Sequence, residues 1–505
     1  MEVHVLSSKL VKPASTKLAA GAPEYIPLSV FDKVTYQMHM AMIFAFAAPA
    51  PAPTAAALEK GLAVALSEYR TLAGQLVRNR SEGPGVLLND RGARVGEACV
   101  DADMVDVDVA LPNPKPELLQ LLPDLEEEAI KEVVVLQLTR FRCGSLAVGF
   151  ARNHAVAGGR ATSNFLVAWG RATRGLTMGL PPMYKYNHLD LFQPRPSHCI
   201  HEFEFDHRNR EYYLPPPPAP APTATAGDKK VIVVHKAHFS KDWIAGLRDT
   251  TSQGRDRPFT RFETILAQLW RAMTRARGLS QDDISTVRIS VDGRSRLGMP
   301  AEYASNLVLW AFPRARVSDL LGQPLSHAAQ LIHDEDDIST VRISVDGRSR
   351  LGMPAEYASN LVLWAFPRAR VSDLLGQPLS HAAQLIHDEV ARVADPAYFR
   401  SFVDFATSGL VEQEGLAPSS EINMRDVLCP DLEVHSWLTF QFYDMDFGTG
   451  TPTYVMPSYI PAEGLIFLAP SYIGDGSIDA FVPVFQDNLE AFKQCLYSID
   501  HHDKE

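Results

Sequence analysis

A histidine stands where an apolar stretch gives way to a glycine-rich turn. The segment is residues 152–159, RNHAVAGG, and the histidine is His154. An imidazole with its ordinary pKa of about 6.5 accepts and returns a proton near neutral pH. At the end of a strand such a side chain can reach a cleft instead of the core. We therefore regard His154 as the candidate general base, and a hydrogen-bonded turn histidine is the alternative.

A second glycine-rich segment lies far downstream. Residues 444–450 read DMDFGTG and contain Asp446, Phe447, Gly448, Thr449 and Gly450. Such a run predicts a tight turn, because glycine adopts backbone conformations that other residues avoid. Asp446 is a candidate second catalytic residue. The alternative, which we favour, is a turn carboxylate paired with an arginine.

Strands and helices must position these residues. Residues 133–141 and 146–153 predict two strands joined by a turn at Cys143 and Gly144, and a helix is expected at 162–171. Further helices are expected at 57–69 and 262–277, and a further strand at 231–239. The result is mixed α/β structure without a Rossmann alternation. The sequence contains no GxGxxG, Walker A or GxSxG motif.

A proline-rich segment divides the chain. Residues 214–230 read LPPPPAPAPTATAGDKK. Proline removes backbone donors and favours an extended polyproline II conformation. We therefore predict an N-terminal domain at residues 1–213, a crossover linker at 214–230 and a C-terminal domain at 231–505.

The C-terminal part contains an internal duplication. Residues 282–335 recur unchanged as residues 336–389, a tandem copy of 54 residues. Solenoid repeats diverge and need several units to build a core, so this pair is not a solenoid. It indicates a recent duplication or an error in a predicted gene. We expect the extra copy to lie outside the core and to disturb local packing, because its apolar strands become exposed edges.

The composition limits the partners. The chain has 60 Asp and Glu and 48 Lys and Arg, which gives a net charge of −12. Proteins that bind nucleic acids or anionic membranes present a basic face, so we expect neither as a partner. Five scattered cysteines without a CxxC pair argue against a disulfide framework and a cysteine zinc site. His235 and His238 face opposite sides of a predicted strand, so no metal is expected. The start of the chain resembles no leader, and we expect a cytoplasmic protein.

The two glycine-rich segments resemble signatures of the plant BAHD acyltransferases, written HxxxDG and DFGWG. Other motifs of that family have counterparts in the family's order: residues 72–76 (LAGQL) for PLAGRL, 137–144 (QLTRFRCG) for QvTxFxCGG, 290–296 (SVDGRSR) for VDGRSR, and 303–306 (YASN) for YFGN. The resemblance covers nearly the whole chain outside the linker and the extra copy. Residues 29–33, 205–208 and 436–438 look most like cereal tryptamine and agmatine hydroxycinnamoyltransferases and tryptamine benzoyltransferases.

The resemblance implies an α/β fold of two similar-sized mixed domains, like chloramphenicol acetyltransferase, with His154 in a channel at their interface. Acyl-CoA is then a co-substrate, no cofactor is permanently bound, and the protein is a monomer. His154 would remove a proton as the acceptor attacks the thioester. We expect an aromatic acyl group, hydroxycinnamoyl or benzoyl, to pass to an arylalkylamine such as tryptamine, serotonin or tyramine. Agmatine and a hydroxyl acceptor are the alternatives.

Two positions depart from the family pattern. Gly158 stands where relatives keep an aspartate that pairs with an arginine, which motif alignment implies to be Arg294 or its copy Arg348. Losing one partner of a buried pair costs about 3–5 kcal/mol, and Gly158 with Gly159 adds backbone freedom. Thr449 replaces the tryptophan of the second signature, and its hydroxyl or a neighbouring N–H would have to serve as the oxyanion donor. We expect an acyl-CoA-dependent acyltransferase of weakened activity; a non-catalytic relative that binds ligands through the old cleft is the rival.

Overall fold

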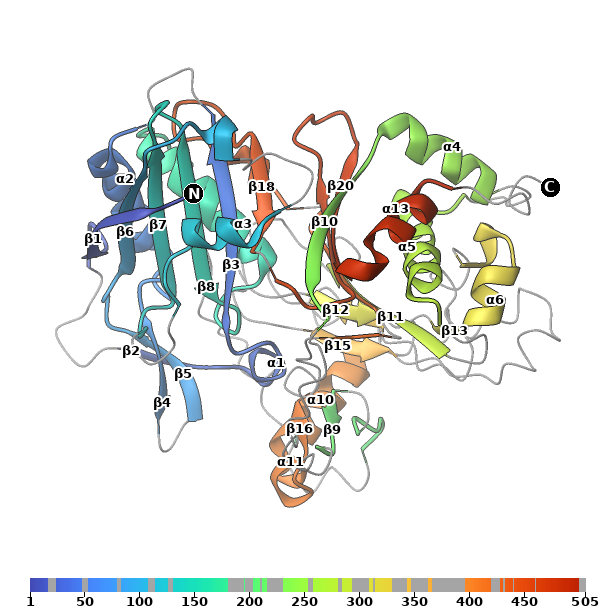
Figure 1. The fold of residues 1–505 in the computed structure, drawn as a ribbon. Helices are drawn as coiled ribbons and strands as arrows, with labels where there is room; N and C mark the ends of the chain where they lie inside the picture. The colour runs from blue at the N-terminus through green and yellow to red at the C-terminus, as the bar shows by residue number, and fades with distance from the viewer. Residues whose placement is uncertain are drawn as a thin grey trace.

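Two β-sheets stand side by side in the computed structural model, each covered by helices on its outer face (Figure 1). The structure describes residues 1–16, 24–47, 53–79, 83–107, 114–125, 130–179, 195, 203–208, 211–215, 230–252, 258–279, 284–292, 308–311, 314–328, 343–346, 362–365, 396–418, 427–429, 432–438, 440–458 and 460–498. The two layers confirm the predicted fold class of two mixed α/β units.

The first sheet has six strands in the order β1-β6-β7-β8-β3-β18. Their bounds are β1 His4–Val11, β3 His39–Phe46, β6 Ala93–Val100, β7 Val134–Phe141, β8 Leu146–Asn153 and β18 Tyr454–Pro457. Strands β7 and β8 pair as the antiparallel hairpin that the sequence predicts. Strand β8 is buried along its whole length, so the residue that directly follows it, His154, lies at the end of an interior strand.

Helices α2 (Ala55–Glu68) and α3 (Gly159–Thr173) cover the outer face of this sheet. Leu62 of α2 and Phe165 of α3 belong to one buried cluster with Phe150 of β8. Helix α3 begins three residues before the predicted position, directly after the turn that carries His154. The hydrophobic layer between sheet and helices therefore fixes both the strand before this histidine and the helix after it.

The second sheet has the order β10-β20-β19-β17-β11-β12, and β13 pairs with β11 beside it. The bounds are β10 Ile232–Phe239, β11 Ile284–Asp292, β12 Val308–Ala311, β13 Arg314–Arg316, β17 Leu432–Ser436, β19 Leu465–Pro470 and β20 Ile478–Phe485. Strand β17 runs parallel to both of its neighbours, β11 and β19. It is therefore an interior strand of the sheet.

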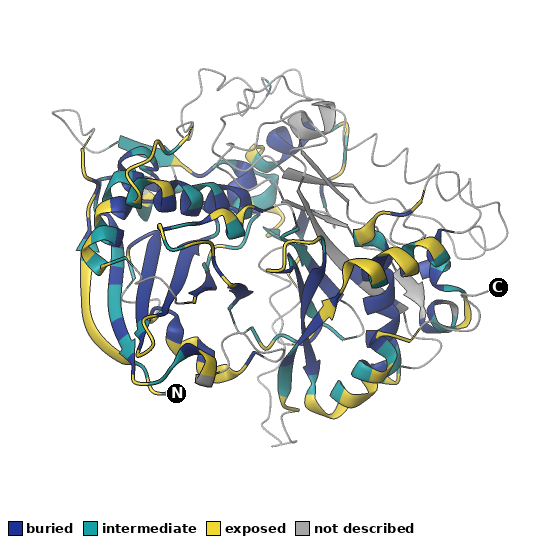
Figure 2. Cartoon of the chain, turned by 90° about the horizontal axis from the view of Figure 1, so that it is seen from above, coloured by how far each residue is buried: buried dark blue, intermediate teal, exposed yellow. Residues whose placement is uncertain are grey.

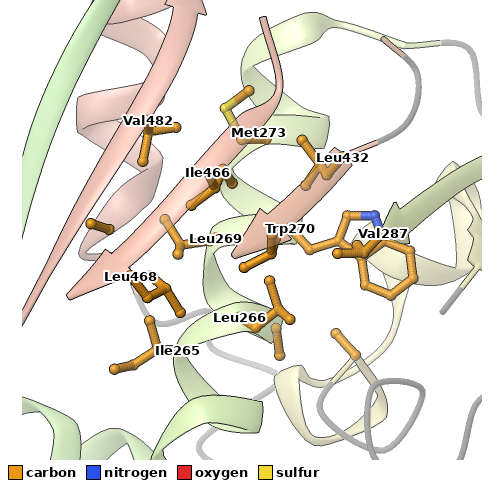
Figure 3. Packing of buried hydrophobic residues seen from close by; sticks show 14 of the residues in the cluster. Ile265, Leu266, Leu269, Trp270, Met273, Val287, Leu432, Ile466, Leu468 and Val482 are labelled. Atoms are coloured by element: carbon orange, nitrogen blue, oxygen red, sulfur yellow. The ribbon is translucent and has the colours of Figure 1, made fainter. Parts of the chain in front are cut away.

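Helix α5 (Arg261–Arg277) packs on the outer face of the second sheet. It begins with a capping box formed by Thr260 and Glu263 and ends at Gly278 in the left-handed conformation, both common helix boundaries. Figure 3 shows the side chains of the helix that meet the strands, among them Leu266 and Trp270. This core holds the strands that carry the second half of the site.

Smaller elements surround the two sheets. Strands β2 Glu24–Pro27, β5 Gly83–Leu88 and β4 Gln75–Asn79 form a three-stranded sheet, and β9 Tyr212–Tyr213 pairs with β16 Ala417–Pro418. The remaining helices are α1 Val30–Lys33, α4 Lys241–Thr251, α6 Val317–Gly322, α10 Pro396–Thr407, α11 Leu410–Gln413 and α13 Leu489–Leu496. Short 3-10 turns lie at Met104–Val107, Pro116–Leu121, Phe442–Asp444 and Gln486–Asn488. No helix in the described part of the chain is long and apolar enough to cross a bilayer.

Strand β18 links the two halves of the chain. It comes from the C-terminal half but pairs antiparallel with β3, so that Tyr454 lies opposite Ala45 in the first sheet. The predicted domain boundary at residues 214–230 does not anticipate that a strand from the C-terminal half joins the first sheet. Most of the predicted linker lies outside the described residues, so the domain bounds stay a prediction.

The two copies of the duplicated segment occupy different places. Strands β11 and β12 of the first copy pair with each other and enter the second sheet through β17. In the second copy, β14 (Ile343–Asp346) and β15 (Val362–Ala365) repeat the same antiparallel pairing. Within the described residues these two strands form a separate two-stranded sheet. The first copy therefore supplies the strands of the main sheet.

The inner faces of the two sheets meet in a shared apolar cluster. Ile43 and Ala151 from the first sheet and Phe467 and Phe481 from the second belong to it, together with Tyr454 of β18. Seen from above, the interior strands β7 and β8 of the first sheet are buried, whereas its edge strand β1 is exposed over most of its length (Figure 2). We call this contact between the two sheets the seam.

Candidate functional site

His154 lies in the turn that joins β8 to α3. Its backbone N–H donates a hydrogen bond of 2.9 Å to the carbonyl of Met38, which ties the turn to the residue before β3. Its half-buried ring meets the edge of the Tyr36 ring at a centroid distance of 6.3 Å and an interplanar angle of 79°. The sequence places the histidine at a strand end, and the fold adds an aromatic neighbour from a distant segment.

The surroundings of His154 favour its neutral form. Burial lowers the pKa of the imidazole well below 6.5, and electrostatic interactions with Arg152 and His435 lower it further. Arg152 is itself buried, which lowers its pKa to about 9. Its Nε donates to Oγ1 of Thr162 at 2.7 Å and its Nη1 to the carbonyl of Met40 at 3.1 Å. A neutral imidazole is the form that accepts a proton.

The other side of the site comes from strand β17. Tyr36 donates its hydroxyl to Oε1 of Glu433 at 2.8 Å, and Nε2 of His435 donates to the same oxygen at 2.9 Å. The ring of His435 stacks on Phe467 of β19 with centroids 5.0 Å apart and an angle of 14°. Tyr36 thus contacts His154 on one side and the second sheet on the other.

The alternation of β17 explains why these groups face the seam. Leu432 and Val434 are buried in the core beneath α5, so Glu433 and His435 point to the opposite face. The same holds for β19, where Ile466 faces the α5 core while its neighbour belongs to the seam cluster. Strand β17 thus presents its apolar side chains to the α5 core and its polar side chains, Glu433 and His435, to the seam.

The glycine pair has two distinct roles. Gly158 is the N-cap of α3, with φ −77° and ψ −179°, and supplies no capping side chain. Gly159 allows close packing, because a Cβ atom built there would lie 2.3 Å from Cε2 of Phe440. The arginines that the resemblance pairs with position 158, Arg294 and Arg348, lie outside the described residues.

Asp446 forms a turn at the far end of α3. Its Oδ1 accepts hydrogen bonds from the backbone N–H groups of Gly448 at 2.7 Å and Gly450 at 3.1 Å. Its Oδ2 accepts one from Nη1 of Arg174, the residue that caps the C-terminus of α3, at 2.7 Å. Helix α3 has 15 residues, and at 1.5 Å per residue it separates this turn from the His154 turn by about 22 Å. These contacts are those of a turn carboxylate paired with an arginine.

The rest of the second motif packs or turns with it. Phe447 is buried between Trp169 of α3 at 4.7 Å and Phe46 of β3 at 5.3 Å, measured between ring centroids. Gly448 and Gly450 have φ angles of +101° and +98°, in the region that favours glycine. Thr449 lies between them, so it sits in the same turn, at the opposite end of α3 from His154.

Sequence reasoning missed Tyr36, Glu433 and His435. No sequence motif joins all three, because they meet only when β17 and the segment after α1 come together across the seam. One signal was present: Glu433 and His435 alternate with the apolar Leu432 and Val434 in this strand, and alternate positions share a face. Two polar side chains on the same face of a buried strand indicate that this face meets another polar group, here the hydroxyl of Tyr36.

Comparison with known proteins agrees with this architecture. A family model described as the Transferase family matches residues 1–335 and again 328–499. Vinorine synthase has the same fold, with a TM-score of 0.61 over 100% of both chains at 17% identity. The second family match begins near the end of the first repeat copy, as a duplication inside the family sequence would produce.

Relatives with described activities cover nearly the whole chain. Putrescine hydroxycinnamoyltransferase 3 of Oryza sativa subsp. japonica is 59% identical over 99% of this chain and 100% of its own length. Agmatine coumaroyltransferase-1 of Hordeum vulgare is 39% identical over 99% and 100%. Tryptamine hydroxycinnamoyltransferase 2 of Oryza sativa subsp. japonica is 31% identical over 99% of each chain. The chain belongs to this Transferase family, the BAHD acyltransferases, and is an acyl-CoA-dependent acyltransferase.

Proposed function

We propose that the protein transfers a hydroxycinnamoyl group from its CoA thioester to an aliphatic diamine of the putrescine type, with His154 as the general base. The observation that carries the proposal is the position of His154. It is a half-buried imidazole with a lowered pKa, next to Tyr36, whose hydroxyl bonds to a carboxylate of the other sheet. A neutral base beside a contact between two halves suits a reaction that joins two substrates.

The proposed reaction is a direct transfer. The neutral amine nitrogen attacks the thioester carbonyl, and His154 takes the proton that the nitrogen loses. The tetrahedral intermediate then expels the CoA thiolate, which recovers that proton from the imidazolium. A C–N bond replaces a C–S bond, so the products are an amide and free CoA. An alkylammonium with a pKa near ~10.4 must first lose its extra proton.

The acceptor is the finer part of the proposal. Similarity to the putrescine enzyme, at 59%, exceeds that to the agmatine enzyme, at 39%, and to the tryptamine enzyme, at 31%. This order supports an aliphatic diamine over the arylalkylamine that the motifs suggested. Tryptamine, serotonin and tyramine remain predicted acceptors with weaker support. We further propose that the protein acts as a cytoplasmic monomer.

A thiol-release assay tests the proposal. Purified protein is mixed with p-coumaroyl-CoA and putrescine, agmatine or tryptamine in turn, and free CoA is measured with a thiol reagent. We expect release with putrescine and a fall of about 10²–10⁴-fold in the His154→Ala variant. No release above that variant with any of the three amines would favour the non-catalytic relative. Release only with tryptamine would restore the arylalkylamine acceptor.

A further inference from the structure

We propose that Arg152 is a positioning residue of the transfer reaction, which fastens the turn that carries His154 and places a positive charge beside the imidazole. The inference rests on the proposed function, because it defines the role of Arg152 with respect to His154 as the base. Arg152 is the second-last residue of β8. Its side chain reaches toward α3, on the face that Phe150 shares, whereas Ala151 between them faces the seam.

The first attachment closes the turn. Nε of Arg152 donates to Oγ1 of Thr162 at 2.7 Å, and the same hydroxyl donates to the carbonyl of Gly158 at 2.8 Å. Gly158 is the N-cap of α3 and supplies no capping side chain of its own. The two hydrogen bonds therefore connect the end of the strand to the start of the helix, with His154 between the two connected points.

The second attachment holds the turn against β3. Nη1 of Arg152 donates to the carbonyl of Met40, its register partner in the β3–β8 pair, at 3.1 Å. The backbone N–H of His154 donates to the carbonyl of Met38, two residues earlier, at 2.9 Å. A guanidinium holds its donors in one rigid plane, which the single ammonium of a lysine does not. The strand, the turn and the first turn of the helix are thereby fixed to one another through Arg152.

The guanidinium is buried, and no carboxylate among the described residues pairs with it. It is 4% exposed, and burial alone lowers its pKa to about 9, so it stays positive at neutral pH. A hydroxyl and a carbonyl are its acceptors at the turn. A buried charge without a counter-charge is costly. Its effect at this place is to oppose a second positive charge on the imidazole of His154.

Other elements also bring polar groups to the neighbourhood of His154. They are Tyr36 after α1, His39 of β3, Arg160 of α3, and Glu433 and His435 of β17. His435 acts on the pKa of His154, and its ring nitrogen bonds to the carboxylate of Glu433. Arg152 has no such counter-charge in the described part of the chain, so its removal should alter the titration of the imidazole.

The test measures the pH dependence of kcat/KM for p-coumaroyl-CoA at saturating putrescine, because the acid limb of this profile reports the base of the free enzyme. In Arg152→Gln, which retains a donor but removes the charge, we expect the acid limb to move to higher pH by at least about half a unit. In Arg152→Lys, which keeps the charge but not the planar fork, we expect the limb to stay and kcat to fall about tenfold or more. A residue that only stabilises the fold would change the amount of folded protein and not the position of the limb.

The matched control is Arg142→Gln, the same change in the turn before β8, where the side chain is 57% exposed. Neither its acid limb nor its kcat should differ from those of the unaltered protein. An unmoved limb in folded Arg152→Gln would overturn the inference. If that variant does not fold, Thr162→Val decides, since it removes the hydroxyl between Arg152 and Gly158 and leaves the charge in place. We expect a lower kcat at an unchanged limb, and an unchanged kcat would overturn the inference.

Failure of the proposed function looks different, since no amine would then release CoA from the unaltered protein. An NMR titration of the His154 ring still tests the inference in that case, because it needs no turnover. The pKa of His154 should be higher in Arg152→Gln than in the unaltered protein. Equal values would contradict the role of Arg152 beside the imidazole.

Discussion

The guanidinium of Arg174 donates a 2.7 Å hydrogen bond to Oδ2 of Asp446 and so ties the end of α3 to a turn from the other half of the chain. Gly158, the N-cap of the same helix, lies four residues after His154. The two signature segments therefore brace opposite ends of one helix. The second segment therefore supports the end of the helix, and the first carries the base that we propose.

Asp446→Ala should destabilise the protein without a specific loss of chemistry. The change removes the acceptor of two backbone hydrogen bonds and of the Arg174 bond. We expect the free energy of unfolding to fall by about 1–3 kcal/mol, with most of the loss from the backbone bonds, since a partly exposed ion pair contributes little. Urea unfolding measures this, with Glu412→Ala as a surface control. A large fall in kcat for fully folded Asp446→Ala would instead make the carboxylate catalytic.

The half-buried position of His154 predicts how stability depends on pH. Its pKa is lowered in the folded protein, so the unfolded chain binds the extra proton first as the pH falls below about 6.5. Stability is therefore lost on acidification between 6.5 and the lowered folded value. We expect the drop in unfolding free energy from pH 7 to pH 5 to be smaller in His154→Gln, which cannot bind that proton. Other groups such as His235, with a pKa lowered to about 4, contribute equally to both proteins and cancel. Identical pH dependence in the two proteins would contradict the lowered pKa.

Gly158→Asp should improve both stability and turnover. Position 158 is the N-cap of α3, with a φ of −77° that any residue adopts, and aspartate there would accept backbone N–H bonds and face the positive end of the helix. A gain of a few tenths to about 1 kcal/mol is expected in thermal unfolding. The thiol-release rate should rise, because a firmer helix start holds the His154 turn. Gly158→Ala is the matched control, since it removes the same backbone freedom without an acceptor. Equal rates for the aspartate and alanine variants would contradict this role of the side chain.

Local sequence predicted most of the frame but not the partner side of the site. The strands before His154 and the helix after it follow from apolar periodicity. The predicted start of α3 was three residues too late, because Gly158 and Gly159 read as part of the turn. The pairing of β18 with β3 has no local signal, since register between distant segments depends on the finished fold. The same reason hid Glu433, whose burial beside Tyr36 arises only from contact across the seam.

Removal of one repeat copy should leave a folded and active protein. Because the copies are identical, deleting residues 282–335 or residues 336–389 gives one and the same chain of 505 − 54 = 451 residues. The first copy already provides β11, which pairs with β17 and so borders the strand that carries Glu433. The second copy adds a separately paired hairpin, β14 and β15, which lies against β11 and β12 but is not hydrogen-bonded into the main sheet. We expect the shorter chain to unfold at the same or a higher temperature and to release CoA at least as fast as the full chain. Loss of cooperative unfolding in the shorter chain would show that the second copy supports the main sheet after all.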